Sequence, residues 1–269
     1  MLLALPIYGQ NRETDYLSHV LEKMNAVESV TYHCVIKAWE PGDKEPVYNV
    51  PREIYEHVNQ QDTAVGYSFL CASDKEFRQP LWVYDGTVFA YIEKEEKEVR
   101  IDDFTQKSPL PFRVIMPQAF GCMKSILEYA LNTQDSIVLS LKDEGKDYLM
   151  ELSIHTPYQV EFFGKACYMP QNPYIYDPTS IYKIWISKEN DMPYRYRREM
   201  QHSISEDICS DFVYNPYGKG KIVAEDYYPA DYVRRIKGEK SQKATVDMTG
   251  KKAPDWTLTD MKGQKVSLS

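Results

Sequence analysis

The sequence has few of the residues on which catalytic and metal sites are built, and those it has are scattered. No two cysteines approach a CxxC spacing, so neither a dithiol nor a zinc site is indicated. The histidines are equally solitary, and no nucleophile motif or phosphate loop is recognisable. We therefore expect no metal, no cofactor and no catalytic residue in this stretch. The cysteines leave two alternatives, buried free thiols or one long-range disulfide, and are Cys34, Cys71, Cys122, Cys167 and Cys209.

Long apolar runs and a concentrated basic face are also missing. No run approaches the ~18 apolar residues of a membrane helix, and a net charge of −8 argues against nucleic-acid binding. The first residues, MLLALPIYGQN, resemble the last part of a secretory signal peptide without its charged start. We interpret residues 1–10 as the remnant of an export signal, which predicts a location in the periplasm or cell envelope. The alternative is a buried N-terminal segment.

Tyrosine, in contrast, is abundant: 22 residues, against only 12 glycines. Tyrosine favours half-buried strands with one wet end, so the bias predicts extensive antiparallel sheet. Two stretches depart from the strand pattern. The first, within residues 11–29, is predicted to be a helix of about four turns with Thr14 as its N-cap. Its apolar stripe at helical spacing consists of Tyr16, Leu17, Val20, Leu21 and Met24. The second lies within residues 115–134, with a stripe made of Ala119, Met123, Ile126, Leu127, Ala130 and Leu131.

The rest of the chain reads as strands joined by short turns. Residues 30–40 are expected to pair with 45–51, whereas 51–62 are ambiguous between a strand and a short helix begun by Pro51. Hairpins are predicted within 136–154 and 158–169, followed by the strand pairs 181–187 with 192–200 and 207–215 with 221–228. About ten strands in consecutive order predict an antiparallel meander over residues 11–235. Residues 236–249 are polar and lysine-rich and indicate a linker.

The clearest element is the hairpin LWVYDGTVFAYI, residues 81–92. Asp85-Gly86 between two alternating runs predicts a two-residue turn, which would place Tyr84 opposite Thr87 and Trp82 opposite Phe89. Leu81, Val83, Val88, Ala90 and Ile92 would then share one face, and Trp82, Tyr84, Phe89 and Tyr91 the other. Because both faces are apolar, each must be covered by core, helix, partner or ligand.

The last twenty residues carry a recognisable pattern after the linker. Gly250, Ala253-Pro254-Asp255, Trp256 and Leu258, then Gly263, Val266 and Leu268, resemble the N-terminal hairpin of TlpA-like and AhpC/TSA peroxiredoxin-like members of the thioredoxin superfamily. The resemblance implies that residues 250–269 open a thioredoxin-like domain whose Cys-x-x-Cys motif is absent here. The longer protein would then be a thiol-disulfide oxidoreductase.

Residues 11–235 resemble, at the level of pattern, the LolA/LppX-like lipoprotein-carrier fold. The matching features are an N-terminal helix ending in KMNAVESVTYH, the hairpin YDGTVFAYIEKEEKEVRI, the mid-chain helix, and IWISKENDMPYRYR. The resemblance implies a mostly β (α+β) fold, a curved antiparallel half-barrel sheet of about ten or eleven strands with two helices covering its concave face. Helices that fit a curved sheet imperfectly leave a cavity. Its expected lining is aromatic: Trp82, Tyr84, Phe89, Tyr91, Tyr182 and Trp185.

Three functions are open, besides a purely structural spacer or dimerisation module that would use the exposed edge strands of an open sheet. The first is a non-catalytic domain of a cell-envelope TlpA-like oxidoreductase, which binds an apolar ligand or a client polypeptide beside a thioredoxin-like domain of the same chain. The second is a free-standing lipid or lipoprotein carrier. The third, an enzyme, has the least support, because paired carboxylates such as Asp102-Asp103 would point to opposite faces of a strand.

Overall fold

The structure is a computed structural model that describes residues 7–78, 80–106, 115, 118–218, 220–239, 257–259 and 262–267. It divides into two units, Met1–Lys237 and Gly238–Ser269. The first unit contains the large sheet and both helices. In the second unit, β15 (Thr257–Thr259) and β16 (Lys265–Ser267) form a small antiparallel hairpin in which Leu258 pairs with Val266. Most of the tail motif, including residues 250 and 253–256, lies outside the described residues.

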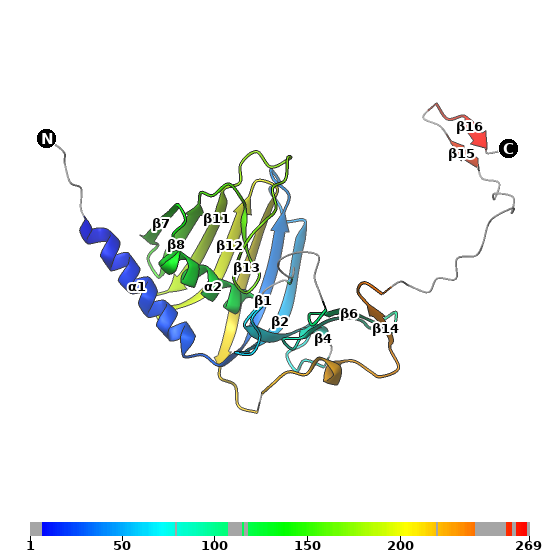
Figure 1. Ribbon diagram of the computed structural model, residues 1–269, viewed down its shortest axis with the longest axis horizontal. Coiled ribbons are helices and arrows are strands. Elements are labelled where there is room, and N and C mark those ends of the chain that lie inside the picture. The colour runs from blue at the N-terminus through cyan, green and yellow to red at the C-terminus, as the bar shows by residue number, and fades with distance from the viewer. Residues whose placement is uncertain are drawn as a thin grey trace. The chain divides into compact units, whose positions relative to one another are not determined.

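The first unit is built on one curved, mostly antiparallel sheet of twelve strands that does not close into a barrel (Figure 1). One half is a meander of β1 (Ser29–Trp39), β2 (Tyr48–Val58), β3 (Tyr67–Ala72), β4 (Pro80–Tyr84), β5 (Val88–Glu93) and β6 (Glu98–Asp103). The other half consists of β7 (Ile137–Asp143), β8 (Asp147–Ile154), β11 (Ser180–Ser187), β12 (Met192–Met200) and β13 (Ser203–Tyr214). The pairing of β1 with β13 joins the two halves. The predicted fold class is therefore confirmed.

Two details of the sheet differ from the meander expected from sequence. The edge strand β14 (Val233–Ile236) runs parallel to β6, so the sheet is not wholly antiparallel. The ambiguous segment after Pro51 is part of one long strand, β2, which includes the proline. Pro51 pairs with Val35 on β1, whereas the pairing of β2 with β3 begins only at Glu53. Proline is tolerated there because β2 has no β3 partner at that position.

Both predicted helices are present, α1 (Ile7–Asn25) and α2 (Ala119–Asn132). In Figure 1, α2 lies across the concave side of the sheet, and α1 packs beside it through Leu17, Val20 and Met24. The stripe predicted for α2 is buried, apart from Leu131, which packs against the core from a partly buried position. The N-cap prediction is wrong, because α1 begins at Ile7 and Thr14 lies inside it. Residues 7–13 contain no proline, so the helical backbone hydrogen bonds can continue on the N-terminal side of Thr14.

The hairpin of β4 and β5 has the predicted faces but not the predicted register. Tyr84 pairs with Phe89 and Trp82 with Tyr91, a shift of two residues that leaves every side chain on its expected face. The cause is Asp85, whose carboxylate accepts hydrogen bonds from the backbone N–H of Thr87 and of Val88, each at 2.8 Å. With this side-chain turn, three residues, 85–87, connect β4 to β5, so the predicted two-residue turn at Asp85-Gly86 is not formed.

Each side of this hairpin is covered, as its two apolar faces require. Tyr55, Leu70, Val83, Ala90 and Ile101 form a row on the outer face, the face away from the helices. The segment predicted as a final strand, residues 221–228, covers this row instead of entering the sheet, and the strand prediction is wrong. It contains a short 3-10 helix, η1 (Ala224–Tyr227), and buries Ile222, Ala224 and Tyr228 on the row.

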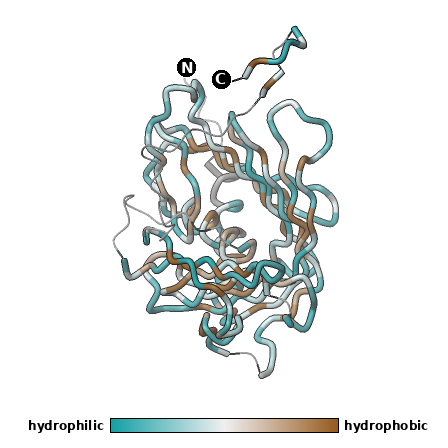
Figure 2. Tube along the Cα trace, turned by 90° about the vertical axis from the view of Figure 1, so that its right-hand side faces the viewer, coloured by the Kyte–Doolittle hydropathy of each residue, from teal (hydrophilic) through white to brown (hydrophobic). Residues whose placement is uncertain are grey.

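A small second hairpin packs on the inner side. It consists of β9 (Val160–Phe162) and β10 (Ala166–Tyr168), as predicted. Its turn needs glycine, because Gly164 has φ +79° and an added Cβ would lie 2.2 Å from the Cα of Val65. Figure 2 shows how the strands curve around the helical centre, with hydrophobic and hydrophilic stretches following one another along them. The main core lies between this inner face and the two helices.

Candidate functional site: a cavity beneath helix α2

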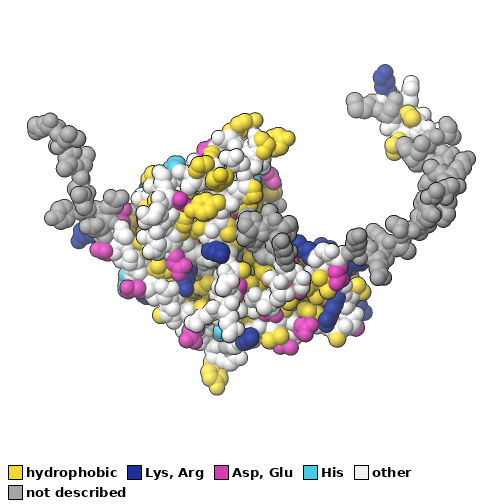
Figure 3. Space-filling view, viewed as in Figure 1, with side chains coloured by type: hydrophobic (Ala, Val, Ile, Leu, Met, Phe, Trp, Pro, Cys, Tyr) yellow, Lys and Arg dark blue, Asp and Glu magenta, His cyan; other side chains and the backbone are white. Residues whose placement is uncertain are grey.

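A cavity of about 270 Å³ remains between α2, the β9–β10 hairpin and the inner face of the sheet. We call it the inner cavity. Its lining is mostly apolar or aromatic and comes from Ala38, Trp39, Glu40, Val47, Cys122, Glu161, Phe162, Phe163, Tyr182, Tyr196, Arg198, Ser203, Ile204 and Ser205. Glu40 and Val47, in the connection between β1 and β2, are exposed, so the cavity reaches the surface there. Figure 3 shows hydrophobic side chains gathered over this side of the sheet.

Strand alternation places the walls of the inner cavity. On β11, Tyr182, Ile184 and Ile186 are buried and their neighbours are half-exposed, so Tyr182 faces the helices. On β12, Tyr196 and Arg198 have the same parity and line the cavity together. From the opposite side α2 contributes Cys122, and the β9–β10 hairpin contributes Phe162. These lining residues of the inner cavity therefore lie on strands and on a helix, which hold their side chains in place.

The polar groups of the inner cavity are few and paired. The guanidinium of Arg198 donates from Nη1 to Glu161 Oε1 at 2.5 Å and from Nη2 to Ser203 Oγ at 2.7 Å. Its Nε is buried without a hydrogen-bond partner. Tyr182 donates its hydroxyl proton to the carbonyl oxygen of Val160 at 2.8 Å. The cavity thus offers an apolar wall with one partly buried charged pair, which suits an apolar group with a polar end.

A buried carboxylate holds the start of α2 over the sheet. Glu56 of β2 accepts hydrogen bonds from the backbone N–H of Phe120 at 3.1 Å and of Gly121 at 3.0 Å, and from the hydroxyl of Tyr32 at 2.5 Å. These N–H groups lack partners inside the helix, and a carboxylate also complements the helix dipole. Burial nevertheless raises the pKa of Glu56 to about 7, and burial likewise raises the pKa of nearby Asp207 to about 7.

The six predicted aromatic residues do not line one cavity. Tyr182 lines the inner cavity. Tyr84 is fully buried and donates its hydroxyl proton to Asp62 Oδ2 at 2.9 Å, whereas Trp82 is half-buried and stacks on Tyr91 with ring centroids 6.2 Å apart. Phe89 and Tyr91 line a separate hollow of about 360 Å³ near β14, together with Arg100, Ile101, Asp102, Arg235, Ile236 and Lys237.

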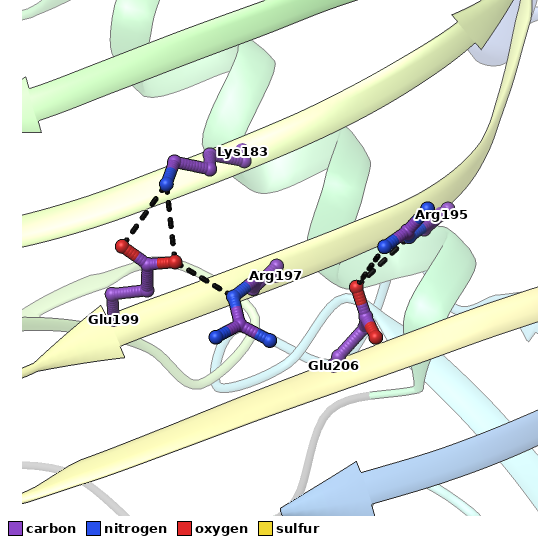
Figure 4. Close-up of polar contacts among 5 residues, drawn as sticks. All are labelled: Lys183, Arg195, Arg197, Glu199 and Glu206. Atoms are coloured by element: carbon purple, nitrogen blue, oxygen red, sulfur yellow. Dashed lines mark hydrogen bonds and ion pairs between the residues drawn. The ribbon is translucent and has the colours of Figure 1, made fainter. Parts of the chain in front are cut away.

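Trp185, the sixth, lies on the outer face, because it is an odd number of residues from Tyr182 on the same strand. Arg195 covers its ring, with the guanidinium carbon 4.0 Å from the centroid, and is bound through Nε and Nη2 to Glu206 Oε1. Figure 4 shows this pair beside Glu199, which accepts from Lys183 and Arg197. These contacts make the outer face of β11–β13 a charged surface.

Sequence reasoning missed most of the inner cavity's wall, notably Arg198, Glu161, Phe162 and Cys122. One signal for Arg198 was available. In MPYRYRREM, Tyr196 and Arg198 share a face that excludes Arg195 and Arg197, so one arginine of the run had to face the core. Nothing comparable marks Glu161, because its environment comes from distant elements.

Comparison with known proteins gives a likeness of fold. No family model and no curated protein matches the sequence. The solved structures that the chain resembles include LolA/LppX-type folds. The lipoprotein LppX of Mycobacterium tuberculosis has a TM-score of 0.39 at 9% identity, covering 78% of this chain and 97% of that one. LprF of Mycobacterium bovis has a TM-score of 0.40 at 9% identity, covering 78% and 98%. A LolA superfamily protein of Nitrosomonas europaea has a TM-score of 0.28 at 10% identity, covering 81% and 99%.

All three TM-scores lie below 0.5, and no argument about this protein rests on them. The comparisons give no support for a thioredoxin-like domain, which the tail motif had suggested. Within the part of the chain that the structure describes, no helix has the length and apolar character needed to cross a membrane. Within the same residues, the side chains of His, Cys, Asp and Glu form no group of three that could hold a metal ion.

Proposed function

We propose that the protein binds an apolar chain of a lipid or of a lipid-modified protein, as a carrier or storage domain, without transforming it. The inner cavity is the beginning of the binding site. The observation that carries the proposal is the incomplete fit of α2 to the concave face, which leaves an apolar space open to the surface beside Glu40 and Val47. A protein with this role works in the cell envelope, in agreement with the export signal predicted for residues 1–10.

The volume sets what this state of the protein can hold. Ligand sites usually measure about 300–1,000 Å³, and the inner cavity, at about 270 Å³, is slightly smaller. It accepts a short apolar group as it stands. A longer chain requires α2 to move away from the sheet, and α2 is the element that fills most of the concave face. The polar end of the ligand would lie near Arg198, a half-buried cation in the lining of the cavity.

The thioredoxin-like partner domain does not enter this proposal, because neither the family models nor the structural comparisons support it. The proposal is therefore a lipid or lipoprotein carrier. The aromatic cluster of the β4–β5 hairpin remains a predicted secondary site, through the hollow at Phe89 and Tyr91.

Binding of a fluorescent long-chain fatty acid, followed by titration, tests the proposal. Ala38→Trp, on the inner face opposite Ser205, fills the inner cavity and should weaken binding at least tenfold, roughly the loss of 1.4 kcal/mol. Ile181→Trp is the matched control, since Ile181 is half-buried on the outer face of β11, and should bind as the wild type does. A wild type that does not bind, or an Ala38→Trp variant that binds normally, would overturn the assignment. Loss of binding in Tyr91→Ala alone would move the site to the second hollow.

A further inference from the structure

Two cysteines meet at the centre of the sheet, on the pairing that joins its halves. Cys34 of β1 and Cys209 of β13 are direct partners in the antiparallel register. Their Sγ atoms are 3.6 Å apart, and the residues are 1% and 4% exposed. In sequence they are separated by 175 positions. We propose that Cys34 and Cys209 form a disulfide bond when the chain folds in contact with an exchangeable disulfide.

The backbone already provides the spacing that such a bond needs. Directly opposed residues of antiparallel strands have Cβ atoms about 4.5–5.5 Å apart, and a disulfide needs about 3.5–4.5 Å between Cβ atoms. The two side chains point to the same face and are already in contact, so a small side-chain and strand adjustment closes the bond. The register between β1 and β13 is irregular between Thr31 and His33, close to Cys34, where the ladder is locally disrupted.

The other three cysteines have no such partner in the sheet register. Cys71 of β3 lies opposite Ile54 on one side and Trp82 on the other. Cys122 belongs to α2, and Cys167 of β10 lies opposite Glu161. The geometry therefore favours one disulfide and three thiols among the five cysteines.

The chemistry requires a disulfide donor, such as oxidised glutathione or a disulfide-carrying oxidoreductase. One thiolate attacks the donor and forms a mixed disulfide, and the second thiolate displaces the donor's remaining half. The two cysteines lose two electrons and two protons in total, and the donor is reduced to two thiols. Burial raises the pKa of the Cys209 thiol well above its ordinary value, so the folded pair reacts slowly. The first thiolate therefore reacts with the donor during folding, before the pair is buried, and the second step follows as β1 and β13 pair.

The test is the thiol count after oxidative folding. The full chain is unfolded, refolded with oxidised and reduced glutathione, then denatured and alkylated for intact mass and peptide mapping. We expect three alkylated thiols of five and a cross-linked peptide pair containing Cys34 and Cys209. Cys71→Ser should keep the cross-link, and Cys34→Ser should show four alkylated thiols and no cross-link. Five alkylated thiols in the wild type, or a cross-link between other cysteines, would refute the proposal.

A stability measurement separates this bond from chance oxidation of denatured protein. The oxidised wild type should melt roughly 5–15 °C higher than the same sample treated with a reductant, because the bond closes a very long loop. Cys209→Ser should show no such difference. Equal melting temperatures for oxidised and reduced wild type would show that the bond is not compatible with the native sheet. Neither result depends on lipid binding, so this inference and the proposed function fail independently.

Discussion

Gly121, in the first turn of α2, lies where helix and sheet come closest. A Cβ added there would be 2.9 Å from Glu56 Oε2 and 3.0 Å from Cδ2 of Tyr67. Gly121→Ala should therefore destabilise the protein by about 1–3 kcal/mol, through overpacking at the point where Glu56 holds the helix. Gly220→Ala is the control, because an added Cβ there meets nothing within 4 Å, and should change stability by less than about 0.5 kcal/mol. Urea unfolding measures both, and equal stability of the two variants would contradict the packing argument.

Glu56 and Asp207 give the protein an unusual dependence on pH. Burial raises the pKa of each to about 7, so between about pH 4 and pH 7 the folded state binds more protons than the unfolded chain. Their contribution to stability is complete below the unfolded pKa values and is lost as the pH rises through 7. The expected loss is on the order of 3 kcal/mol per group.

The measurement is the difference in unfolding free energy between the wild type and the double variant Glu56→Gln/Asp207→Asn. This difference should shift against the wild type as the pH rises from 4.5 to 7, and then level off. The exposed Asp43→Asn is the control and should follow the wild type throughout. A difference that does not change over this interval would show that the two acids are already charged in the folded state.

The sequence predicts Tyr182 as a lining residue, and strand alternation shows that Arg198 lies on the inner face. It cannot predict that Glu56 is buried. In REIYEHV, Ile54 and Glu56 share the inner face by alternation. A glutamate at such a position normally indicates a strand that ends in solvent. Glu56 is buried because the N-terminus of α2, more than sixty residues away in sequence, provides its hydrogen-bond donors. A long-range partner of this kind leaves no local signal.

At the level of elements, the β4–β5 hairpin shows which predictions are robust. Alternation fixed its two faces correctly, because a shift of two residues keeps side-chain parity. The turn type was wrong, because Asp85 forms side-chain hydrogen bonds instead of adopting a two-residue turn. The strand predicted for 221–228 failed for a related reason. Apolar side chains that cover a sheet have the same composition as those within one, and only the tertiary structure distinguishes them.

Asp85 also connects the β4–β5 hairpin to residues 221–228, the segment that covers it. Its Oδ2 accepts a hydrogen bond from the backbone N–H of Ala224 at 3.1 Å. These backbone hydrogen bonds help to hold the pKa of Asp85 below its ordinary value, although partial burial acts to raise it. Asp85→Ala removes the acceptor for three backbone donors and should cost about 1–3 kcal/mol. Hydrogen exchange should show loss of protection at Thr87, Val88 and Ala224, with little change in β11–β13. Asp231→Ala, at an exposed position, should leave both stability and protection unchanged.

At the scale of the whole molecule, the concave face explains both the fold and the proposed function. A curved sheet with an apolar inner face needs cover, and two helices with a small hairpin provide it incompletely. The two halves of the outer face differ in how they are kept from exposing apolar surface. Residues 222–232 cover the apolar half over β3–β6. The half over β11–β13 carries charged pairs and arginines stacked on tryptophan rings, so it needs no cover. Among the described residues, the inner cavity is the space that opens from this concave face to the surface.

The two halves of the sheet share this one core, which leads to the last prediction. The main core takes Ile54 and Cys71 from the first half and Ile184 and Cys209 from the second, so neither half can lose its structure alone. Single-tryptophan versions that keep only Trp82 or only Trp185, with the other tryptophans replaced by phenylalanine, report on the two halves separately. Urea unfolding followed by fluorescence should give the same midpoint for both. Two separated midpoints would mean that the halves are independent units, and that the concave face is assembled by docking rather than by folding.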